Sequence, residues 1–233
     1  LRRILRHSSA DVVHLHSSKA GLIGRLTIRG RRPTIFSPHA WSFLHEGPWM
    51  QRGARAWERW AARWADVLLC GSAAEQARGE RAGLRAAFRT VPNAVDLDRF
   101  RPAGPDERAA ARRQLGLGDE PLAVCVGRLV AQKGQDELLA AWPTVRDRVT
   151  HASLVLVGDG PRRSAYAAQA GEAVRFVAAT PDVRPWYVAA DVVVQPSRWE
   201  TLSLSVLEAL ACGRSVVATD VEGMREAIGA DAG

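Results

Sequence analysis

The sequence is poor in several residue types, and each scarcity narrows the class of protein that it can encode. Only three of its 233 residues are cysteine, and Cys70, Cys125 and Cys212 lie in or beside apolar runs, where a thiol behaves as a small buried group. This pattern argues against a disulfide framework and favours a reducing compartment. No apolar run approaches the roughly 18 residues of a membrane span, and no signal-peptide pattern opens the chain. We therefore expect a cytoplasmic protein and leave contact with the inner face of the plasma membrane open.

Lysine is almost absent, since Lys19 and Lys133 are the only two among 32 basic residues. The arginines are spread along an alanine-rich chain without a block of five or more, although the net charge is +7. Such a charge suits a phosphate-bearing donor, a nucleic acid or an acidic lipid. The even spread favours a compositional bias over a dedicated basic surface, and we predict no nucleic-acid partner. With 47% hydrophobic and 24% charged residues, the chain is typical of a globular protein rather than a disordered or fibrous one.

Short β-branched runs alternate with helical patterns along the whole chain, which indicates βαβ units and parallel sheets. The expected strands are 11–16, 33–37, 67–70 and 88–91 in the first half, and 122–126, 153–157, 174–177, 191–195 and 215–218 in the second. The expected helices are 18–29, 50–65, 73–83, 134–149, 161–170, 182–190, 202–212 and 222–229.

A turn-rich segment at 91–105 separates the two halves and indicates a linker between two α/β domains. We expect an acceptor-side domain at 1–98, a hinge at 99–118 and a donor-binding domain at 119–233. The chain starts at Leu1 rather than Met and ends just after a helical pattern. The expectation is therefore that the first domain lacks its N-terminal part and the second its C-terminal helices.

Two strand ends in the second half carry residues suited to phosphate. Gly127 and Arg128 follow one strand, and Lys133 precedes the next helix, which is where open α/β sheets bind ligands and where a cation pair can hold a diphosphate. The alternative is a strand-terminal arginine and a surface lysine. A second strand ends in Gly158-Asp159-Gly160-Pro161, a weaker signal that also fits an ordinary tight turn.

The segment from Pro196 to Gly213 holds Glu200 and Glu208, eight residues apart, around the start of a helix. The backbone amides at 201–204 and the positive helix end favour a phosphate, and carboxylates accept hydrogen bonds from sugar hydroxyls. The alternative is a helix N-terminal charge at Glu200 and a solvated Glu208. Apolar neighbours of Glu208 indicate partial burial, where an unpaired carboxylate is costly.

Together these motifs resemble the retaining glycosyltransferases of the GT-B fold, specifically glycosyltransferase family 4. The resemblance extends over nearly the whole chain, including the 92–100 hinge, and depends on the order and spacing of its motifs. It implies two Rossmann-like α/β domains whose parallel sheets face each other across a cleft, the first domain incomplete. It also implies retaining transfer from a nucleotide-diphosphate sugar to a glycan or lipid-linked acceptor in cell-surface polysaccharide or glycolipid synthesis.

Residue roles follow from the same resemblance. Arg128 and Lys133 are expected on the donor diphosphate, Glu200 on the transferred sugar and Glu208 on the ribose. His39, after an expected strand end, is expected beside the sugar, with a structural loop histidine as the alternative. The expected catalytic set is therefore His39, Arg128, Lys133 and Glu200. The expected donor-binding set is Gly127, Arg128, Lys133, Gly158, Gly160, Glu200, Thr201, Leu202, Ser203, Leu204 and Glu208.

The implied chemistry needs no cofactor and no metal, because fixed cations and helix-end amides can stabilise the diphosphate as its charge develops. The chain departs from the family pattern at Thr201 and Ala178, where glycines are usual, which leaves the choice between uridine and guanosine open. Two other functions are also left open, namely a sugar-nucleotide epimerase of similar architecture and a non-catalytic nucleotide-sugar-binding module.

Three further patterns are interpreted mainly as structural features. Asp96-Leu97-Asp98 spells an Asp-x-Asp metal motif but lies in the hinge. His14 and His16 share a strand face, yet the sequence shows no third ligand near them. Tryptophans 57, 60 and 64 form one helical stripe beside an arginine stripe. We expect this tryptophan stripe to pack against the first sheet, with a helix at a membrane interface as the alternative.

Overall fold

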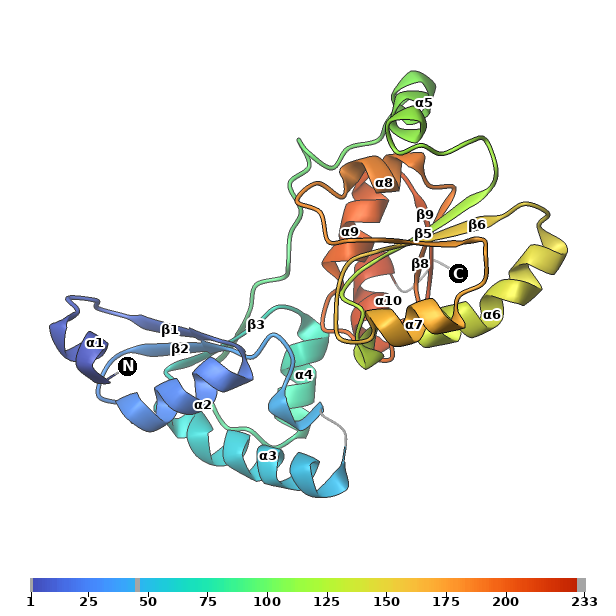
Figure 1. Cartoon of the computed structure of the whole chain (residues 1–233). Helices are drawn as coiled ribbons and strands as arrows, with labels where there is room; N and C mark the ends of the chain where they lie inside the picture. The colour runs from blue at the N-terminus through green and yellow to red at the C-terminus, as the bar shows by residue number, and fades with distance from the viewer. Residues whose placement is uncertain (1, 45–46, 230–233) are drawn as a thin grey trace. The chain divides into compact units, whose positions relative to one another are not determined.

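The computed structural model describes residues 2–44 and 47–229, which fold into two compact α/β units (Figure 1). The first unit ends at Asn93 and the second begins at Ala94. Each unit has a parallel sheet of its own, so the expected fold class of two α/β domains with parallel sheets is confirmed. Each unit is described by itself below.

The first unit is a four-stranded sheet in the order β1-β2-β3-β4 with helices along one face. Because the strands are adjacent in chain order, right-handed crossovers place α2, α3 and α4 on the same side (Figure 1). The elements are α1 (Arg2–His7), β1 (Val13–His16), α2 (Ser17–Ile28), β2 (Thr34–Ser37), a 3₁₀ turn (Ser42–Leu44), α3 (Pro48–Ala61), a second 3₁₀ turn (Ala62–Trp64), β3 (Val67–Cys70), α4 (Ala73–Arg81) and β4 (Phe88–Thr90).

The core of the first unit contains Phe36, Trp41 and Leu68, which are almost fully buried. An ion pair is buried among the helices, where Arg25 of α2 donates to Glu58 of α3 at 2.7 Å and both side chains are at most 1% exposed. Removing one partner of such a pair would leave an uncompensated buried charge, which costs about 3–5 kcal/mol. The pair therefore fixes how α2 and α3 pack.

The tryptophan stripe is not the buried face of α3. The fully buried residues of α3 are Glu58 and Ala61, whereas Trp60 is 44% exposed. Trp57, Trp60 and Trp64 contact one another through tilted and edge-to-face rings, with ring centroids 4.2–6.3 Å apart. The expectation that this stripe packs against the sheet is wrong, because small residues and a buried ion pair fill that place.

The second unit is a five-stranded parallel sheet in the order β7-β6-β5-β8-β9, with helices on both faces (Figure 1). Helices α6 and α7 cover one face, and α8 and α9 cover the other. The elements are α5 (Pro105–Gln114), β5 (Leu122–Val126), a 3₁₀ turn (Ala131–Lys133), α6 (Gln135–Arg148), β6 (Ser153–Val157), α7 (Arg163–Gln169), β7 (Val174–Val177), α8 (Arg184–Ala189), β8 (Val192–Gln195), α9 (Leu204–Ala211), β9 (Ser215–Ala218) and α10 (Glu222–Ile228).

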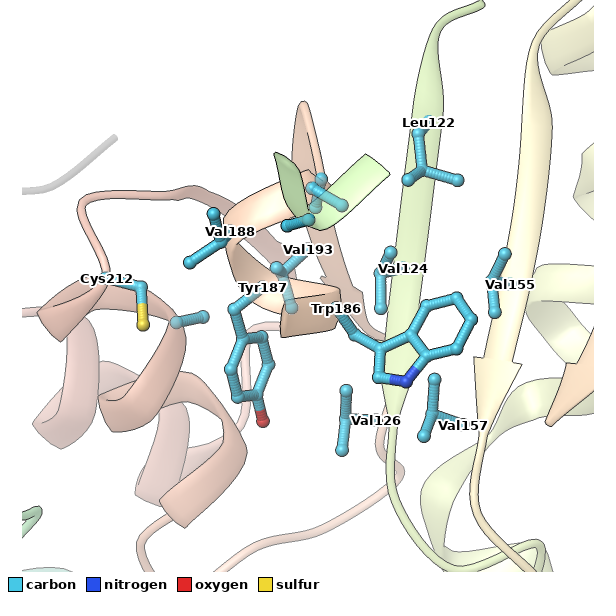
Figure 2. Packing of buried hydrophobic residues seen from close by; sticks show 14 of the residues in the cluster. Leu122, Val124, Val126, Val155, Val157, Trp186, Tyr187, Val188, Val193 and Cys212 are labelled. Carbon is cyan, nitrogen blue, oxygen red and sulfur yellow. The ribbon is translucent and has the colours of Figure 1, made fainter. Parts of the chain in front are cut away.

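Alternation along β5 divides the core of this unit into two clusters. Val124 and Val126 point to the α8 side, where Figure 2 shows the rings of Trp186 and Tyr187 against them. Cys125 points to the α6 side with Trp142 and others. Because β5 is buried on both faces, its sequence is a continuous apolar run rather than an alternation of apolar and polar residues.

The range expected as a hinge, 99–118, contains the ten-residue helix α5. This helix packs on α8, and Arg112 of α5 donates to the Ala189 carbonyl oxygen at 3.0 Å and to Asp191 at 2.8 Å. The range is therefore largely integrated into the second unit. Over the described ranges, the structure has no helix long and apolar enough to cross a membrane.

Candidate functional site

The strand order of the second unit creates a topological switch point between β5 and β8. The chain runs from β5 outward through β6 to β7, then returns to place β8 on the other side of β5. The loops that follow β5 and β8 therefore begin at the carboxyl ends of two neighbouring strands and lead away from each other. Open α/β sheets bind ligands at such a point, and both sequence-predicted phosphate segments, 127–134 and 196–204, lie there.

Lys133 and Glu200 meet at this switch point. The Lys133 ammonium donates to Glu200 Oε1 at 2.5 Å, and the two side chains are only 14% and 7% exposed. Ser197 Oγ donates to the same carboxylate oxygen at 2.8 Å, and the buried Gln195 side chain donates to Ser197 at 3.2 Å. The structure thus brings together the predicted lysine and glutamate and adds two supporting side chains that the sequence patterns did not identify.

Arg198 holds the two loops together. Its guanidinium donates to both Asp136 carboxylate oxygens at 2.8 Å and to the Glu137 carboxylate at 2.9 Å, at the start of α6. It also donates to the Ala131 carbonyl oxygen at 2.6 Å, and its backbone N–H donates to the Gln132 carbonyl oxygen at 2.8 Å. The Arg198 hydrogen bonds hold the pKa of Asp136 below its ordinary value. The neighbouring acidic residues Asp136 and Glu137 are the sequence feature from which this contact could have been predicted.

Gly134 permits the close approach of these loops. It has φ +64, and a Cβ atom there would lie 2.0 Å from the Pro196 carbonyl oxygen. A side chain is therefore excluded both by backbone conformation and by space. This glycine places Lys133 directly beside the segment that follows β8.

Arg128 provides a second cation at the carboxyl end of β5. Its side chain is exposed and has no ion-pair partner among residues 2–44 and 47–229. Gly127 lies against the Lys133 side chain, since a Cβ atom at Gly127 would lie 3.7 Å from it. One cation is thus paired with a carboxylate, and the other is available to an anionic ligand.

Gly158 and Gly160 have a packing role at this edge of the sheet. A Cβ atom at Gly158 would lie 2.1 Å from the Gly127 carbonyl oxygen, and one at Gly160 would lie 2.3 Å from the Leu129 carbonyl oxygen. The loop after β6 therefore rests on the loop after β5. Their predicted contact with a ligand stays a prediction, because this packing already accounts for both glycines.

The start of α9 lies between the two predicted glutamates. Leu202 and Ser203 are buried, Thr201 is half-buried and Leu204 is exposed. Ser203 is the N-cap of α9 without a side-chain cap hydrogen bond, and its buried hydroxyl has no partner in the described part of the chain. The first turn carries no acidic residue, so the positive helix end is not neutralised by its own side chains.

Glu208 lies further along α9 and is half-buried, as its apolar neighbours indicated. Its carboxylate accepts a hydrogen bond from the Tyr187 hydroxyl at 2.8 Å. Burial raises the pKa of Glu208, which the Tyr187 hydrogen bond and the charge of Arg99 partly oppose. Tyr187 was not foreseen from the sequence, because α8 carries no motif of its own.

His39 lies in the first unit, just after β2, in an unusual backbone conformation. His39 has φ +48 and Ala40 has φ +113, and the Ala40 N–H donates to the buried Glu75 carboxylate at 2.7 Å. His39 Nε2 lies 2.8 Å from His16 Nδ1, so one ring donates to the other. Left-handed conformations in residues other than glycine are concentrated at functional sites.

His14 lies beside this histidine pair, with its ring centroid 3.9 Å from that of His16 and its Nε2 2.9 Å from Ser37 Oγ. Burial, then the charges of His16 and His39, lower the pKa of His14. The sequence identified all three histidines but not their grouping, since it showed no third imidazole near His14 and His16, whereas the structure places His39 beside His16. No group of His, Cys, Asp or Glu within the described ranges is arranged to hold a metal ion.

Asp96, the first residue of the Asp-x-Asp sequence, has a turn-forming role. Its carboxylate accepts hydrogen bonds from the backbone N–H groups of Asp98 and Arg99 at 3.0 and 3.1 Å. This is a local turn in which a side chain satisfies two backbone donors.

Two family models match the chain. One described as "Glycosyltransferase Family 4" matches residues 1–99, and one described as "Glycosyl transferases group 1" matches residues 120–233.

Curated relatives are similar over most of the chain. It is 36% identical, over 97% of its length and 63% of the relative's, to a GDP-mannose-dependent alpha-(1-6)-phosphatidylinositol monomannoside mannosyltransferase of Mycolicibacterium smegmatis. It is 33% identical, over 76% of its length and 52% of the relative's, to the lipopolysaccharide core biosynthesis mannosyltransferase LpsB of Rhizobium meliloti. The chain thus spans less than two thirds of the length of these relatives.

Solved structures agree on the architecture. HepE of Anabaena in complex with UDP-glucose superposes with a TM-score of 0.80 at 26% identity, covering 93% of this chain and 61% of HepE. The complex of HepE with UDP and glucose superposes with a TM-score of 0.82 at 24% identity, covering 97% and 63%.

Proposed function

This chain belongs to glycosyltransferase family 4, and on that basis we propose that the protein transfers a sugar from a nucleotide-diphosphate donor to a glycan or lipid-linked acceptor with retention of configuration. The observation that carries the proposal is the Lys133–Glu200 pair beside the exposed Arg128, at the switch point of the second sheet. Two cations, a helix N-terminus and a carboxylate suit a diphosphate joined to a sugar.

In the proposed reaction the bond between sugar C1 and the phosphate oxygen breaks, and the electron pair stays on the diphosphate. Arg128, Lys133 and the α9 amides would stabilise that charge as it develops. The released phosphate oxygen would take the proton of the acceptor hydroxyl, whose oxygen bonds to C1 on the same face. Protein cations would supply the charge compensation, so the proposal includes independence of a metal and a cofactor.

We propose GDP-mannose as the donor, with UDP-glucose as the alternative. The relatives with names that state GDP-mannose dependence support the first, and the HepE complex with UDP-glucose supports the second. Because phosphatidylinositol mannoside and lipopolysaccharide core occur in the names of relatives, we propose a lipid-linked acceptor. The three free, buried cysteines support a reducing compartment, so a cytoplasmic location at the inner membrane face is part of the proposal.

Calorimetry of the full-length protein with GDP-mannose and UDP-glucose, in buffer containing EDTA, tests the donor. Saturable binding of GDP-mannose in preference to UDP-glucose is expected, and binding of neither would overturn the donor assignment. Product analysis then separates transfer from epimerisation, because an isomerised nucleotide sugar formed without acceptor identifies an epimerase. A protein that binds the donor but releases no sugar to any glycolipid extract would be a binding module.

A further inference from the structure

A pocket of about 460 Å³ lies in the second unit, at the edge of the sheet opposite to the candidate donor site. Its walls include Asp119, which precedes β5, Asp191, which directly precedes β8, and Arg214, which directly precedes β9. Because these strands are parallel, their amino ends share one edge of the sheet. Lys133 and Glu200 follow the carboxyl ends, a strand length of about 13 Å away. The pocket is therefore separate from the proposed donor site.

Positive charge exceeds negative charge in the walls of this pocket. Its charged residues are three arginines and two aspartates, namely Arg108, Arg112, Arg214, Asp119 and Asp191. The Asp191 carboxylate accepts hydrogen bonds from both Arg108 and Arg112, so one carboxylate serves two guanidinium groups. Arg214 forms no ion pair among residues 2–44 and 47–229. The pocket thus carries more guanidinium charge than its own carboxylates compensate.

The three arginines differ in how many of their donors the fold already uses. All three guanidinium nitrogens of Arg112 donate, to three backbone carbonyl oxygens and to Asp191. Arg108 donates through Nη2 alone, and its Nε is shielded from solvent without a partner in the described part of the chain. Arg214 donates through Nε and Nη1 to two backbone carbonyl oxygens, at 3.3 Å each. Arg112 is therefore structural, whereas Arg108 and Arg214 retain unused donors.

Arg108 and Arg214 reach neighbouring points of the pocket wall. Arg108, on α5, donates to the Asp191 carboxylate, and Arg214 donates to the carbonyl oxygen of the preceding residue, Ala190. In the large majority of cases a buried donor in a protein is hydrogen-bonded. The unpartnered Nε of Arg108 therefore indicates an acceptor that the described residues do not supply.

We propose that Arg108 and Arg214 bind the phosphate group of a small ligand in this pocket, at a second site that does not depend on the donor site. A phosphate group offers oxygens in several directions, so guanidinium groups from two different elements can each donate to it. A carboxylate has only two oxygens, which one guanidinium group can occupy alone.

The size of the pocket bears on what the phosphate is attached to. Its volume of about 460 Å³ falls within the range of about 300–1,000 Å³ of small-molecule sites. There is thus room for an organic group, such as a sugar, beside the phosphate. Free inorganic phosphate and a phosphate monoester share the chemistry that the two arginines recognise, and the experiment distinguishes between them.

Calorimetric titration of the full-length protein with inorganic phosphate, and separately with glucose 6-phosphate, tests the proposal. The variants Arg108→Gln and Arg214→Gln are compared with Arg113→Gln, which changes an exposed arginine of α5 outside the pocket walls. Arg128→Gln is a second control, because it removes an exposed cation of the proposed donor site, where a phosphate group is also expected to bind. Circular dichroism checks that each variant is folded.

We expect wild type, Arg113→Gln and Arg128→Gln to bind at least one of the two probes saturably. Arg108→Gln and Arg214→Gln should each lose roughly tenfold or more in affinity, because each removes a charge-assisted hydrogen bond. Asp119→Asn should tighten binding by roughly two- to fivefold, because it removes an exposed negative charge from the pocket. Since Asp119 is exposed, this variant still tests the site if Arg214→Gln does not fold.

Three results would each overturn the proposal. They are no saturable binding of either probe to wild type, affinities of the Arg108→Gln and Arg214→Gln proteins that match those of the controls, and loss of all phosphate binding in Arg128→Gln. The last result would assign the phosphate to the donor site alone. GDP-mannose binding by Arg108→Gln is expected to be unchanged, so failure of the second site is distinguishable from failure of the transfer proposal.

Discussion

Lys133 and Glu200 lie 67 residues apart in the chain and form an ion pair of 2.5 Å in which both side chains are largely buried. Glu200 follows β8, and Lys133 follows the neighbouring strand β5. Burying a charge is costly unless a partner compensates it. Each of these residues therefore stabilises the protein only while the other is present, and the pair lies at the same edge of the sheet as the exposed Arg128.

Replacing Lys133 by methionine should lower both stability and donor affinity. Glu200 would remain buried without its cation, which costs about 1–3 kcal/mol, and the diphosphate would lose a charge partner worth roughly tenfold in affinity. The double variant Lys133→Met with Glu200→Gln should recover most of the stability but not the affinity. Urea unfolding and calorimetry measure the two effects. Recovery of affinity in the double variant would contradict the donor role of Lys133.

Gly134→Ala should destabilise the second unit by roughly 2–4 kcal/mol, because the new methyl group would meet the Pro196 carbonyl oxygen and the backbone has φ +64. The matched control is Gly171→Ala, where no atom lies within 4 Å of the added Cβ. Thermal unfolding of both variants provides the comparison. Equal melting temperatures for the two would show that the loops after β5 and β8 can separate at little cost.

Glu208→Gln should stabilise the protein near neutral pH while weakening donor binding. The pKa of Glu208 is raised by burial, so the folded protein holds this proton more tightly than the unfolded chain does. Wild type therefore loses stability as the pH rises from 4.5 through the folded-state pKa. Glutamine keeps an acceptor for Tyr187 and removes this loss, which should raise the melting temperature at pH 7. A melting temperature that falls at pH 7 would contradict the assignment of burial as the dominant cause.

The histidine cluster of the first unit should weaken that unit in mild acid. The pKa of His14 lies below 6.5 because of burial and the neighbouring His16 and His39, so the unfolded chain binds the proton more tightly. Stability is complete above pH 6.5 and decreases as the pH falls through the folded-state pKa. His14→Gln, which can still bond Ser37, should reduce this decrease, whereas the exposed His7→Gln should not. Urea midpoints measured from pH 7.5 to pH 5, a range chosen about the ordinary histidine value, test this difference.

Strand positions were predictable to within two residues because short apolar runs rich in β-branched residues mark parallel strands. The expected strands at 67–70, 122–126, 153–157, 174–177 and 215–218 match β3, β5, β6, β7 and β9 residue for residue. Helix α5 was missed, because its sequence is mostly charged residues and alanine, without an apolar stripe. Its buried contact is made by Arg112 through hydrogen bonds, which periodicity does not reveal.

The site was predictable in its residues but not in its connections. Motif spacing identified Lys133 and Glu200, but their ion pair depends on β8 lying beside β5, a tertiary fact that no local pattern contains. The tryptophan stripe of α3 was misassigned for a related reason. Hydrophobicity alone ranks Trp60 above Ala61 as the buried residue, whereas the structure buries Ala61 and the Arg25–Glu58 pair and leaves Trp60 exposed.

Arg198 has a consequence for how donor preference can change in evolution or in the laboratory. Its hydrogen bonds join the segment after β8 to Ala131, Asp136 and Glu137 after β5, so the conformation of each segment depends on the other. A chimaera that imports only one segment from a homologue of different specificity would place Glu200 against a mismatched loop. Residues 127–137 and 195–203 should therefore be inherited, and exchanged, as a single module, although nearly sixty residues separate them in the gene.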